Sequence, residues 1–203
     1  AWRQPAAPAA GWRIAAAHSD SPAWRVKGAA VKSGCTMLLT EGYGGMIRAS
    51  WLDRPLGLAG RVLVRTAAGV EARLIAPDRD LAVMPHPAIH LDRGLNDGHK
   101  YDPKADMQAL FAPGDKTADY EALLAAEAGC AVKDILGADI LLYCRQEGTT
   151  AGSEGELILC PRLDDLACAW ATLQGFLEAP ASEEGAVWCL FDNEEVGSGT
   201  RQG

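Results

Sequence analysis

Short apolar segments and polar stretches alternate at both ends of the chain. Residues 12–17 form an apolar run that ends at His18, and residues 186–191 form a second run. Segment 163–178 has large apolar residues on one helix face: Leu166, Trp170, Leu173 and Leu177. The pattern predicts two buried strands and an amphipathic helix, which is typical of an α/β fold.

The middle of the chain has the pattern of β-structure with irregular loops. Residues 61–66 and 70–75 alternate around a short turn, which predicts a β-hairpin. Residues 77–113 are rich in Pro, Asp, His and Gly and predict a long loop-bearing region. The other elements predicted are two strands and a short helix, at 139–144, 156–160 and 119–129.

This change of pattern suggests that one domain is inserted into another. We expect residues 1–30 and 156–203 to form two segments of one α/β domain, with a β-rich domain at 31–155 between them. The chain stops where residues 198–203 would begin a further helix. Because two or three parallel strands do not make a stable sheet, we expect the chain to be a fragment of a longer protein.

Composition and charge exclude several classes of protein. Of 203 residues, 48% are hydrophobic and 23% are charged, which is typical of a globular protein. The net charge of −8 counts against nucleic acid and anionic membranes as main partners. The apolar runs are too short to span a bilayer, so we expect no membrane partner.

The six cysteines point to a reducing compartment. They form no C-x-x-C pair, as a structural zinc site would need, and they are too sparse for a disulfide scaffold. Four lie in apolar segments and are expected to be buried, reduced thiols: Cys144, Cys160, Cys168 and Cys189. The sequence therefore predicts a cytoplasmic protein.

Three polar clusters follow predicted strands or begin the predicted helix. They contain His18 and Asp20, then Asp164 and Asp165, then Glu194 and Glu195. In an open α/β sheet, ligands bind outside the carboxyl ends of the strands. One imidazole and several carboxylates suit a divalent metal such as zinc, and a second carboxylate can act as a general base.

Each cluster alone has a simpler interpretation. His18 and Asp20 could be a surface pair, Asp164 could cap a helix, and the two glutamates could lie on a solvated face. Only the three clusters together favour a metal site.

The histidines of the loop region leave two interpretations open. His86 and His90 lie four residues apart, but Pro87 between them disfavours a helical metal-binding pair. They are either ordinary loop histidines or donors that face a substrate. His99 is expected to be exposed.

Five ordered blocks are spread over almost the whole sequence: His18-Ser19-Asp20-Ser21-Pro22; Tyr43-Gly44-Gly45 with Trp51-Leu52-Asp53-Arg54 and Leu58-Ala59-Gly60-Arg61-Val62; Pro85-His86 with Ala88-Ile89-His90-Leu91-Asp92-Arg93 and Asn96; Pro161-Arg162-Leu163-Asp164-Asp165-Leu166; and Asp192-Asn193-Glu194-Glu195-Val196-Gly197-Ser198 with Gln202-Gly203. In these blocks the sequence resembles the M18 metallopeptidases, the aspartyl aminopeptidase family. Ser19 and Asp165 replace the Thr and Asn that are usual in the family.

The resemblance implies an aminopeptidase with two zinc ions per active site. His18 would bind one zinc, Asp164 would bridge both, and Glu195 would bind the other. Glu194 would be the general base and Asp20 would orient the His18 ring. A further Asp and a further His would come from sequence outside this chain, and without them we expect the fragment alone to be inactive.

The resemblance also implies the architecture and the partners. The fold would be a zinc-peptidase α/β sandwich domain, incomplete here, interrupted by a β-rich dimerisation domain. The substrates would be peptides, including peptides with an acidic N-terminal residue. The subunits would form dimers within a dodecamer. His90 would reach the active site of a neighbouring subunit and contact the substrate there. Two alternatives stay open: a related di-metal hydrolase of non-peptide amides, and a non-catalytic member of the family.

Overall fold

The computed structural model describes residues 1–5, 10–197 and 199, and the chain divides into two compact units. The first unit joins Ala1–Pro22 to Gly148–Gly203, and the second unit is Ala23–Glu147. The boundaries drawn from composition lie further along the chain, because composition does not reveal that Ala23 already begins a strand of the second unit.

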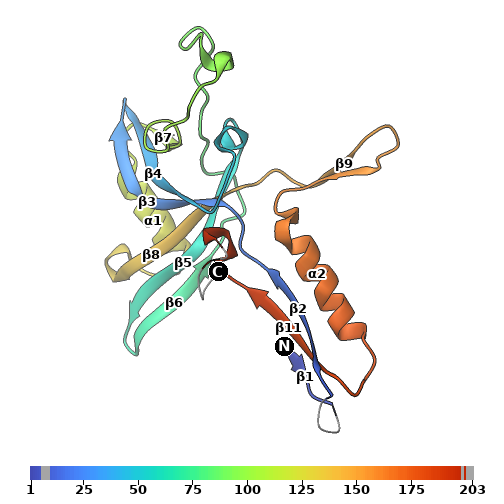
Figure 1. Cartoon of the computed structure of the whole chain (residues 1–203). Coiled ribbons are helices and arrows are strands. Elements are labelled where there is room, and N and C mark those ends of the chain that lie inside the picture. Colours follow the sequence, from blue (N-terminus) through green and yellow to red (C-terminus); the bar gives the residue numbers. More distant parts are fainter. Residues whose placement is uncertain (6–9, 198, 200–203) are drawn as a thin grey trace. The chain divides into compact units, whose positions relative to one another are not determined.

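The first unit contains a three-stranded sheet, a helix and a hairpin (Figure 1). The sheet has the order β1 (Trp2–Arg3), β11 (Gly185–Phe191) and β2 (Trp12–His18). β2 and β11 are parallel, with His18 opposite Phe191, whereas β1 is antiparallel to β11. Helix α2 spans Leu163–Glu178, and β9 (Thr149–Ala151) pairs with β10 (Leu157–Leu159). These elements confirm the predicted strands and helix, whereas the helix predicted from residue 198 lies outside the described residues.

The burial predicted for these elements is wrong in the described chain. Trp12 and Ile14 of β2 are exposed, and so are Trp170 and Leu177 on the predicted apolar face of α2. α2 packs against the sheet through its Ala169 side, and Thr172 there accepts a hydrogen bond from Trp188 of β11 (3.0 Å). One helix covers only one face of a sheet, so a continuous apolar run, which suits a strand with two covered faces, leaves apolar residues in solvent here.

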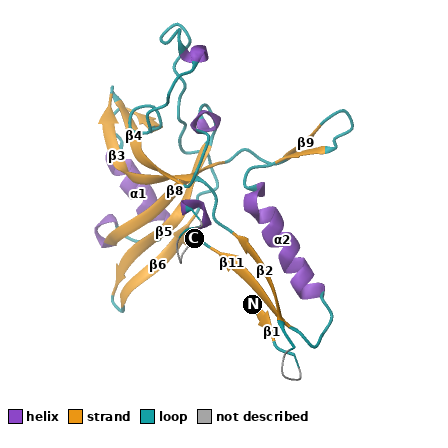
Figure 2. Cartoon of the chain, viewed as in Figure 1, coloured by secondary structure: helices purple, strands orange, loops and turns teal. Residues whose placement is uncertain are grey.

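The second unit contains a six-stranded antiparallel sheet and one α-helix (Figure 2). Its strands follow the order β6, β5, β8, β3, β4, β7. Their bounds are β3 Ala23–Lys32, β4 Cys35–Tyr43, β5 Leu56–Thr66, β6 Gly69–Ile75, β7 Ala109–Pro113 and β8 Ile135–Cys144. The helix α1 is Thr117–Glu127, and single 3-10 turns lie at Arg48–Trp51, Leu95–Asp97 and Val132–Asp134. The predicted hairpin, α1 and β8 are confirmed.

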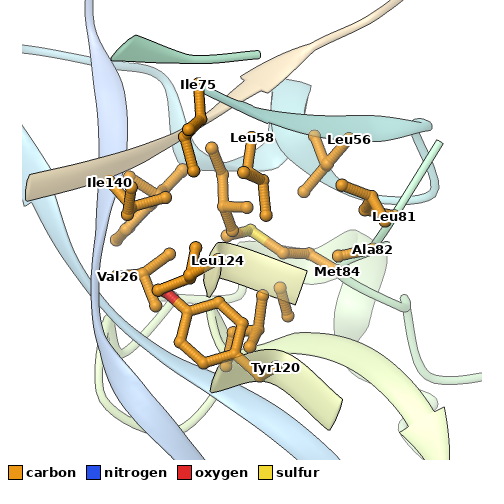
Figure 3. Packing of buried hydrophobic residues seen from close by; sticks show 14 of the residues in the cluster. Val26, Leu56, Leu58, Ile75, Leu81, Ala82, Met84, Tyr120, Leu124 and Ile140 are labelled. Atoms are coloured by element: carbon orange, nitrogen blue, oxygen red, sulfur yellow. The ribbon is translucent and has the colours of Figure 1, made fainter. Parts of the chain in front are cut away.

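The main hydrophobic core of the described residues lies within this second unit. Tyr120 and Leu124 of α1 pack against Val26 and the sheet, and Leu81 and Met84 belong to the same cluster (Figure 3). Burial raises the pKa of Tyr120 to about 12, because the phenolate would have to be desolvated. α1 therefore stays in place by burial of its apolar side.

The sequence pattern did not predict β3, because charges interrupt its apolar run. Arg25 forms an ion pair with Asp139 of β8 (3.1 Å), and Lys27 forms one with Glu41 of β4 (3.1 Å). These contacts to neighbouring strands let a charged segment run through the sheet while Trp24 and Val26 face the core.

The cysteines are free, but the prediction that four of them are buried is wrong. None of the six forms a disulfide. Cys160 and Cys168 are exposed, and Cys144 and Cys189 are half-buried, since they belong to the incompletely covered first unit or to the end of β8. No helix among residues 1–5, 10–197 and 199 is long and apolar enough to cross a membrane.

Gly60 allows the close approach of β5 and β8, so its replacement by alanine is expected to destabilise the second unit. A Cβ atom at Gly60 would lie 2.0 Å from the carbonyl oxygen of Asp139 and 2.9 Å from the Cα atom of Ile140. Gly60→Ala should lower the free energy of unfolding by about 3 kcal/mol, the upper range for overpacking. Gly137→Ala on β8 is the control, since nothing lies within 4 Å of that Cβ position. Denaturant unfolding followed by tryptophan fluorescence measures both, and equal stabilities would contradict the prediction.

Candidate active site

The carboxyl ends of β2 and β11 lie side by side in the first unit. His18 is the last residue of β2 and is paired in register with Phe191, the last residue of β11. The Ser19 amide donates a hydrogen bond to the Phe191 carbonyl (2.9 Å), which continues the pairing one residue past the strand. The two chain segments that leave the sheet therefore start from neighbouring points.

His18 is held in one orientation by Asp20. The side chain of His18 is 12% exposed, and its Nδ1 atom lies 3.0 Å from the Asp20 carbonyl oxygen and 3.3 Å from Asp20 Oδ1. Since both partners are acceptors, the geometry assigns a proton to Nδ1, and Nε2 is then the ring nitrogen that can bind a metal ion. His18 and Asp20 are therefore not a solvent-exposed surface pair.

The carboxylate of Asp20 also holds the turn that carries the two glutamates. Asn193 adopts a left-handed conformation (φ 68°), which turns the chain after β11 into a 3-10 turn at Glu194–Val196. The Glu194 amide donates to Asp20 Oδ1 (3.2 Å) and the Glu195 amide donates to Asp20 Oδ2 (3.0 Å). The Asp20 side chain is only 7% exposed, and these bonds compensate for its desolvation.

The pair Asp164 and Asp165 precedes the regular part of α2 and meets His18 from a third segment. Both residues have non-helical dihedral angles and are joined by a cis peptide bond. The Asp165 carboxylate accepts a hydrogen bond from the Cys168 amide in the first turn of the regular helix, so Asp165 rather than Asp164 caps α2. Asp164 Oδ1 lies 3.2 Å from His18 Nε2, and its side chain is 87% exposed. Asp165 Oδ2 accepts a hydrogen bond from the His18 amide (3.1 Å).

The cluster is strongly negative, and its pKa shifts reflect this. Burial lowers the pKa of His18, but the hydrogen bond with the Asp20 carbonyl and the charges of Glu194 and Asp165 outweigh burial and leave this pKa raised. Burial and then the charge of Asp164 raise the pKa of Glu195. Hydrogen bonds from Cys168 and from the His18 amide lower the pKa of Asp165. Five carboxylates around one imidazole create an electrostatic demand for a cation.

The spacing of His18 and Asp164 fits two ligands of one zinc ion. Ligand atoms that each lie about 2.0 Å from a tetrahedral zinc are roughly 3.3 Å apart, close to the observed 3.2 Å between Nε2 and Oδ1. Glu194 Oε2 lies 3.7 Å from the same Nε2. Within the described residues, no three His, Cys, Asp or Glu side chains are placed so that they alone could hold a metal ion. The imidazole and carboxylate donors fit zinc, but in the described chain only His18 and Asp164 lie at ligand spacing, so the site is not closed.

The remaining histidines lie in the second unit. His90 is exposed in a turn closed by a hydrogen bond from the Leu91 amide to the Ala88 carbonyl (2.8 Å). His86 Nε2 lies 3.1 Å from the Tyr101 hydroxyl, so it has a structural partner. His99 is an exposed residue, as predicted, and it lies between carboxylates of Asp92 and Asp106.

Sequence reasoning missed two contacts of the site. Asp165 was not assigned a role, although it fixes the main chain of His18. Asp20 was expected to orient His18, but its two bonds to the glutamate turn were not foreseen. The contact of Asp165 with His18 was signalled only by the position of Asp165 next to Asp164. The bonds of Asp20 to the two glutamate amides had no signal, because every residue except proline has a backbone amide.

The comparisons with known proteins agree with this geometry. The family model described as "Aminopeptidase I zinc metalloprotease (M18)" matches residues 2–203. The chain belongs to this family. The family is thus one of zinc metalloproteases, and the predicted resemblance is confirmed.

Individual M18 relatives match over about half of their length. A probable M18 family aminopeptidase 2 from Clostridium acetobutylicum is 36% identical over 202 residues, which cover 95% of this chain and 47% of that protein. Another from Pseudomonas entomophila is 39% identical over 198 residues, which cover 93% and 46%. A chain in the cryo-EM structure of the Ape4 and Nbr1 complex superposes with a TM-score of 0.87 at 30% identity, covering 97% of this chain and 43% of that one. The mixed α/β fold of the M18 aminopeptidases is therefore confirmed.

Loss of the Asp20 carboxylate should release the glutamate turn. In Asp20→Ala the Glu194 and Glu195 amides lose their acceptors, so we expect their hydrogen exchange to accelerate at least about tenfold, equivalent to about 1.4 kcal/mol. Asp192→Ala is the matched control, because Asp192 lies in the same turn and accepts from the Asn193 amide (2.9 Å), whereas the Glu194 and Glu195 amides donate to Asp20. Exchange of peptides spanning 190–197, measured by mass spectrometry, decides between them. Equal protection in both variants would show that Asp20 does not hold the turn.

Proposed function

We propose that the protein is a di-zinc aminopeptidase that hydrolyses the bond after the N-terminal residue of peptides. The observation that carries the proposal is the convergence of His18 and Asp164 at ligand spacing, with the opposite nitrogen of the His18 ring held by Asp20. Membership of a zinc metalloprotease family supports it. Because the chain spans about half of its relatives' length, the activity is proposed for the complete protein.

Three side chains of this chain would hold the metals. We assign His18 to one zinc, Asp164 to a bridging position and Glu195 to the second zinc. A carboxylate can bridge because its two oxygens each carry lone pairs, and the 87% exposed Asp164 side chain leaves both of them accessible. When bound, the zinc ions would acidify a water molecule and polarise the scissile carbonyl.

Glu194 is the proposed general base. Its carboxylate lies beside His18 Nε2 (3.7 Å), and its main chain is anchored on Asp20, so it can accept a proton from water at a fixed place. The same carboxyl group can then return the proton to the leaving amine nitrogen. The negative cluster also suits the ammonium group of a peptide N-terminus, which favours exopeptidase action.

A second copy of the chain is the proposed partner. In the M18 resemblance, His90 comes from a neighbouring subunit and donates a hydrogen bond to the oxygen that gains charge during attack by water. The exposed turn that carries His90 leaves this side chain accessible for such a role. We therefore propose a homo-oligomer built from dimers, with peptides as substrates.

Two substitutions separate the base from the metal ligands. In the complete protein, Glu194→Gln should retain both zinc ions but lose about 10²- to 10⁴-fold in turnover, because an amide cannot accept the proton. Asp164→Ala should instead lose zinc, because no other group would bridge the two ions. Metal analysis together with a peptidase assay measures both variants. Full turnover in Glu194→Gln, or full zinc content in Asp164→Ala, would contradict the respective assignment.

The same assay tests the alternatives. Hydrolysis of N-acyl amides but not of peptides would favour the non-peptide amide hydrolase, and zinc binding without any hydrolysis would favour a non-catalytic member. Peptides that differ only in an Asp or Leu N-terminal residue test the proposed preference for acidic N-termini.

Mixing two inactive variants tests the role of His90 across subunits. His90→Phe should bind zinc normally but lose about 10²- to 10³-fold in turnover, as expected for one missing oxyanion donor. When His90→Phe and Glu194→Gln subunits of the complete protein are mixed, some sites combine an intact His90 with an intact Glu194, and activity should partly return. Native mass spectrometry verifies subunit exchange. Exchange without recovered activity would refute the assignment.

A further inference from the structure

Strand β6 forms an unprotected edge of the sheet in the second unit. It is the end strand of the order β6, β5, β8, β3, β4, β7, and Figure 1 shows it at the margin of the sheet. Its pairing with β5 runs without a register shift, and its seven residues (Gly69–Ile75) include no Pro. Its two charged residues, Glu71 and Arg73, form an ion pair with each other (2.8 Å) and so compensate each other's charge. Edge strands are usually protected by proline, by register shifts or by uncompensated charges, because unpaired main-chain groups otherwise pair with another strand.

The opposite edge of the same sheet is protected. Strand β7 contains Pro113, and its pairing with β4 has a register shift between Thr36 and Met37. Proline removes a main-chain donor, and an irregular register interrupts the ladder. The difference between the two edges singles out β6.

The hairpin fixes which main-chain groups of β6 are unpaired. Thr66 and Gly69 are paired on either side of a two-residue turn, and Glu71 and Arg73 pair with Val64 and Val62 of β5. Hydrogen-bonded pairs alternate along an antiparallel ladder, so four residues of β6 direct their main-chain groups towards β5: Gly69, Glu71, Arg73 and Ile75. The amides and carbonyls of the remaining residues point to the free edge: Val70, Ala72 and Leu74.

We propose that β6 pairs antiparallel with β6 of a second copy of this chain, about a two-fold axis at Ala72. In this register, each outward-pointing residue meets another: Val70 meets Leu74 of the copy and Ala72 meets its own equivalent. Each of these three residues offers one amide and one carbonyl, so all outward groups of the three are satisfied together. Registers displaced by two residues would leave some of them unpaired.

The side chains of β6 match the same register. Val70 and Leu74 are 65% and 85% exposed, and they would lie directly opposite each other on the outer face of the joined sheet. On the other face, Glu71 would lie opposite Arg73 of the copy. Glu71 and Arg73 already form an ion pair within one strand (2.8 Å), so their charges compensate in the monomer and again across the pair. Both faces of the strand are therefore self-complementary.

This inference names a surface for the self-association that forms part of the proposed function, and it rests on that part alone. Its test reads association rather than hydrolysis. Dimers that persist when β6 is blocked overturn this surface while leaving the proposed oligomer and the proposed activity intact.

The first measurement is sedimentation velocity of the full chain over a range of concentrations. Ala72→Lys places two ammonium groups opposite each other on the axis, so we expect at least about tenfold weaker dimerisation than in the unaltered chain. Ala67→Lys is the matched control: it adds the same charge at an exposed residue of the hairpin turn, off the edge, and should leave dimerisation unchanged. Equal dimerisation of Ala72→Lys and the unaltered chain, or no dimer of the unaltered chain, overturns the proposal.

The second measurement does not depend on disrupting the interface. Ala72→Cys brings two thiols together across the axis, so mild oxidation should give a covalent dimer whose peptide map shows a disulfide between the two residues at position 72. Ala67→Cys is the control, because the axis keeps the two turns far apart. A covalent dimer linked at position 72 supports the two-fold register. Its absence, or linkage through position 67, overturns the register.

Discussion

The candidate site depends on one buried carboxylate, that of Asp20. Its oxygens accept the amides of Glu194 and Glu195, while its carbonyl and Oδ1 face Nδ1 of His18. A buried charge is costly unless such partners surround it. The two bonds therefore stabilise the buried Asp20 carboxylate as well as the glutamate turn. One residue thereby links the ends of β2 and β11, which are distant in sequence but adjacent in the sheet.

The two units of the chain bury their apolar residues to different degrees. In the second unit, both the sheet and α1 contribute to a core that excludes Trp24 and Leu58 from water. In the first unit, α2 contacts one face of β2 and β11, and Trp12 and Ile14 stay exposed. A parallel pair of strands normally has helices on both faces. The chemistry of the site is therefore positioned by hydrogen bonds and strand register more than by burial.

The two proposals use different properties of the same chain. The peptidase site is built from side chains that gather where strands end, whereas self-association of β6 is built from main-chain groups that no neighbouring strand of the described unit accepts. Both follow from the same rule, that polar groups find partners. Carboxylates and an imidazole are satisfied by a cation, and an unpaired edge is satisfied by another edge.

The sequence by itself determined several of the local elements and the family. Apolar spacing predicted α2 with its observed bounds, the hairpin of β5 and β6, and the strands that end at His18 and Phe191. Such features depend on neighbours a few residues away, so a linear pattern contains them. The five motif blocks likewise named His18, Asp164 and Glu194 before any distance between them was available.

Only the tertiary structure decided which groups touch. It brought the Asp165 carboxylate to the amide of His18, although 147 positions separate them, and it removed Asp164 from the role of a helix cap. It also decided that Leu177 is exposed and that β6, rather than β7, is the open edge. These outcomes depend on main-chain partners and on which faces other segments cover. Amides and carbonyls are the same in nearly every residue, so their partners are fixed by the fold and not by the letters of the sequence.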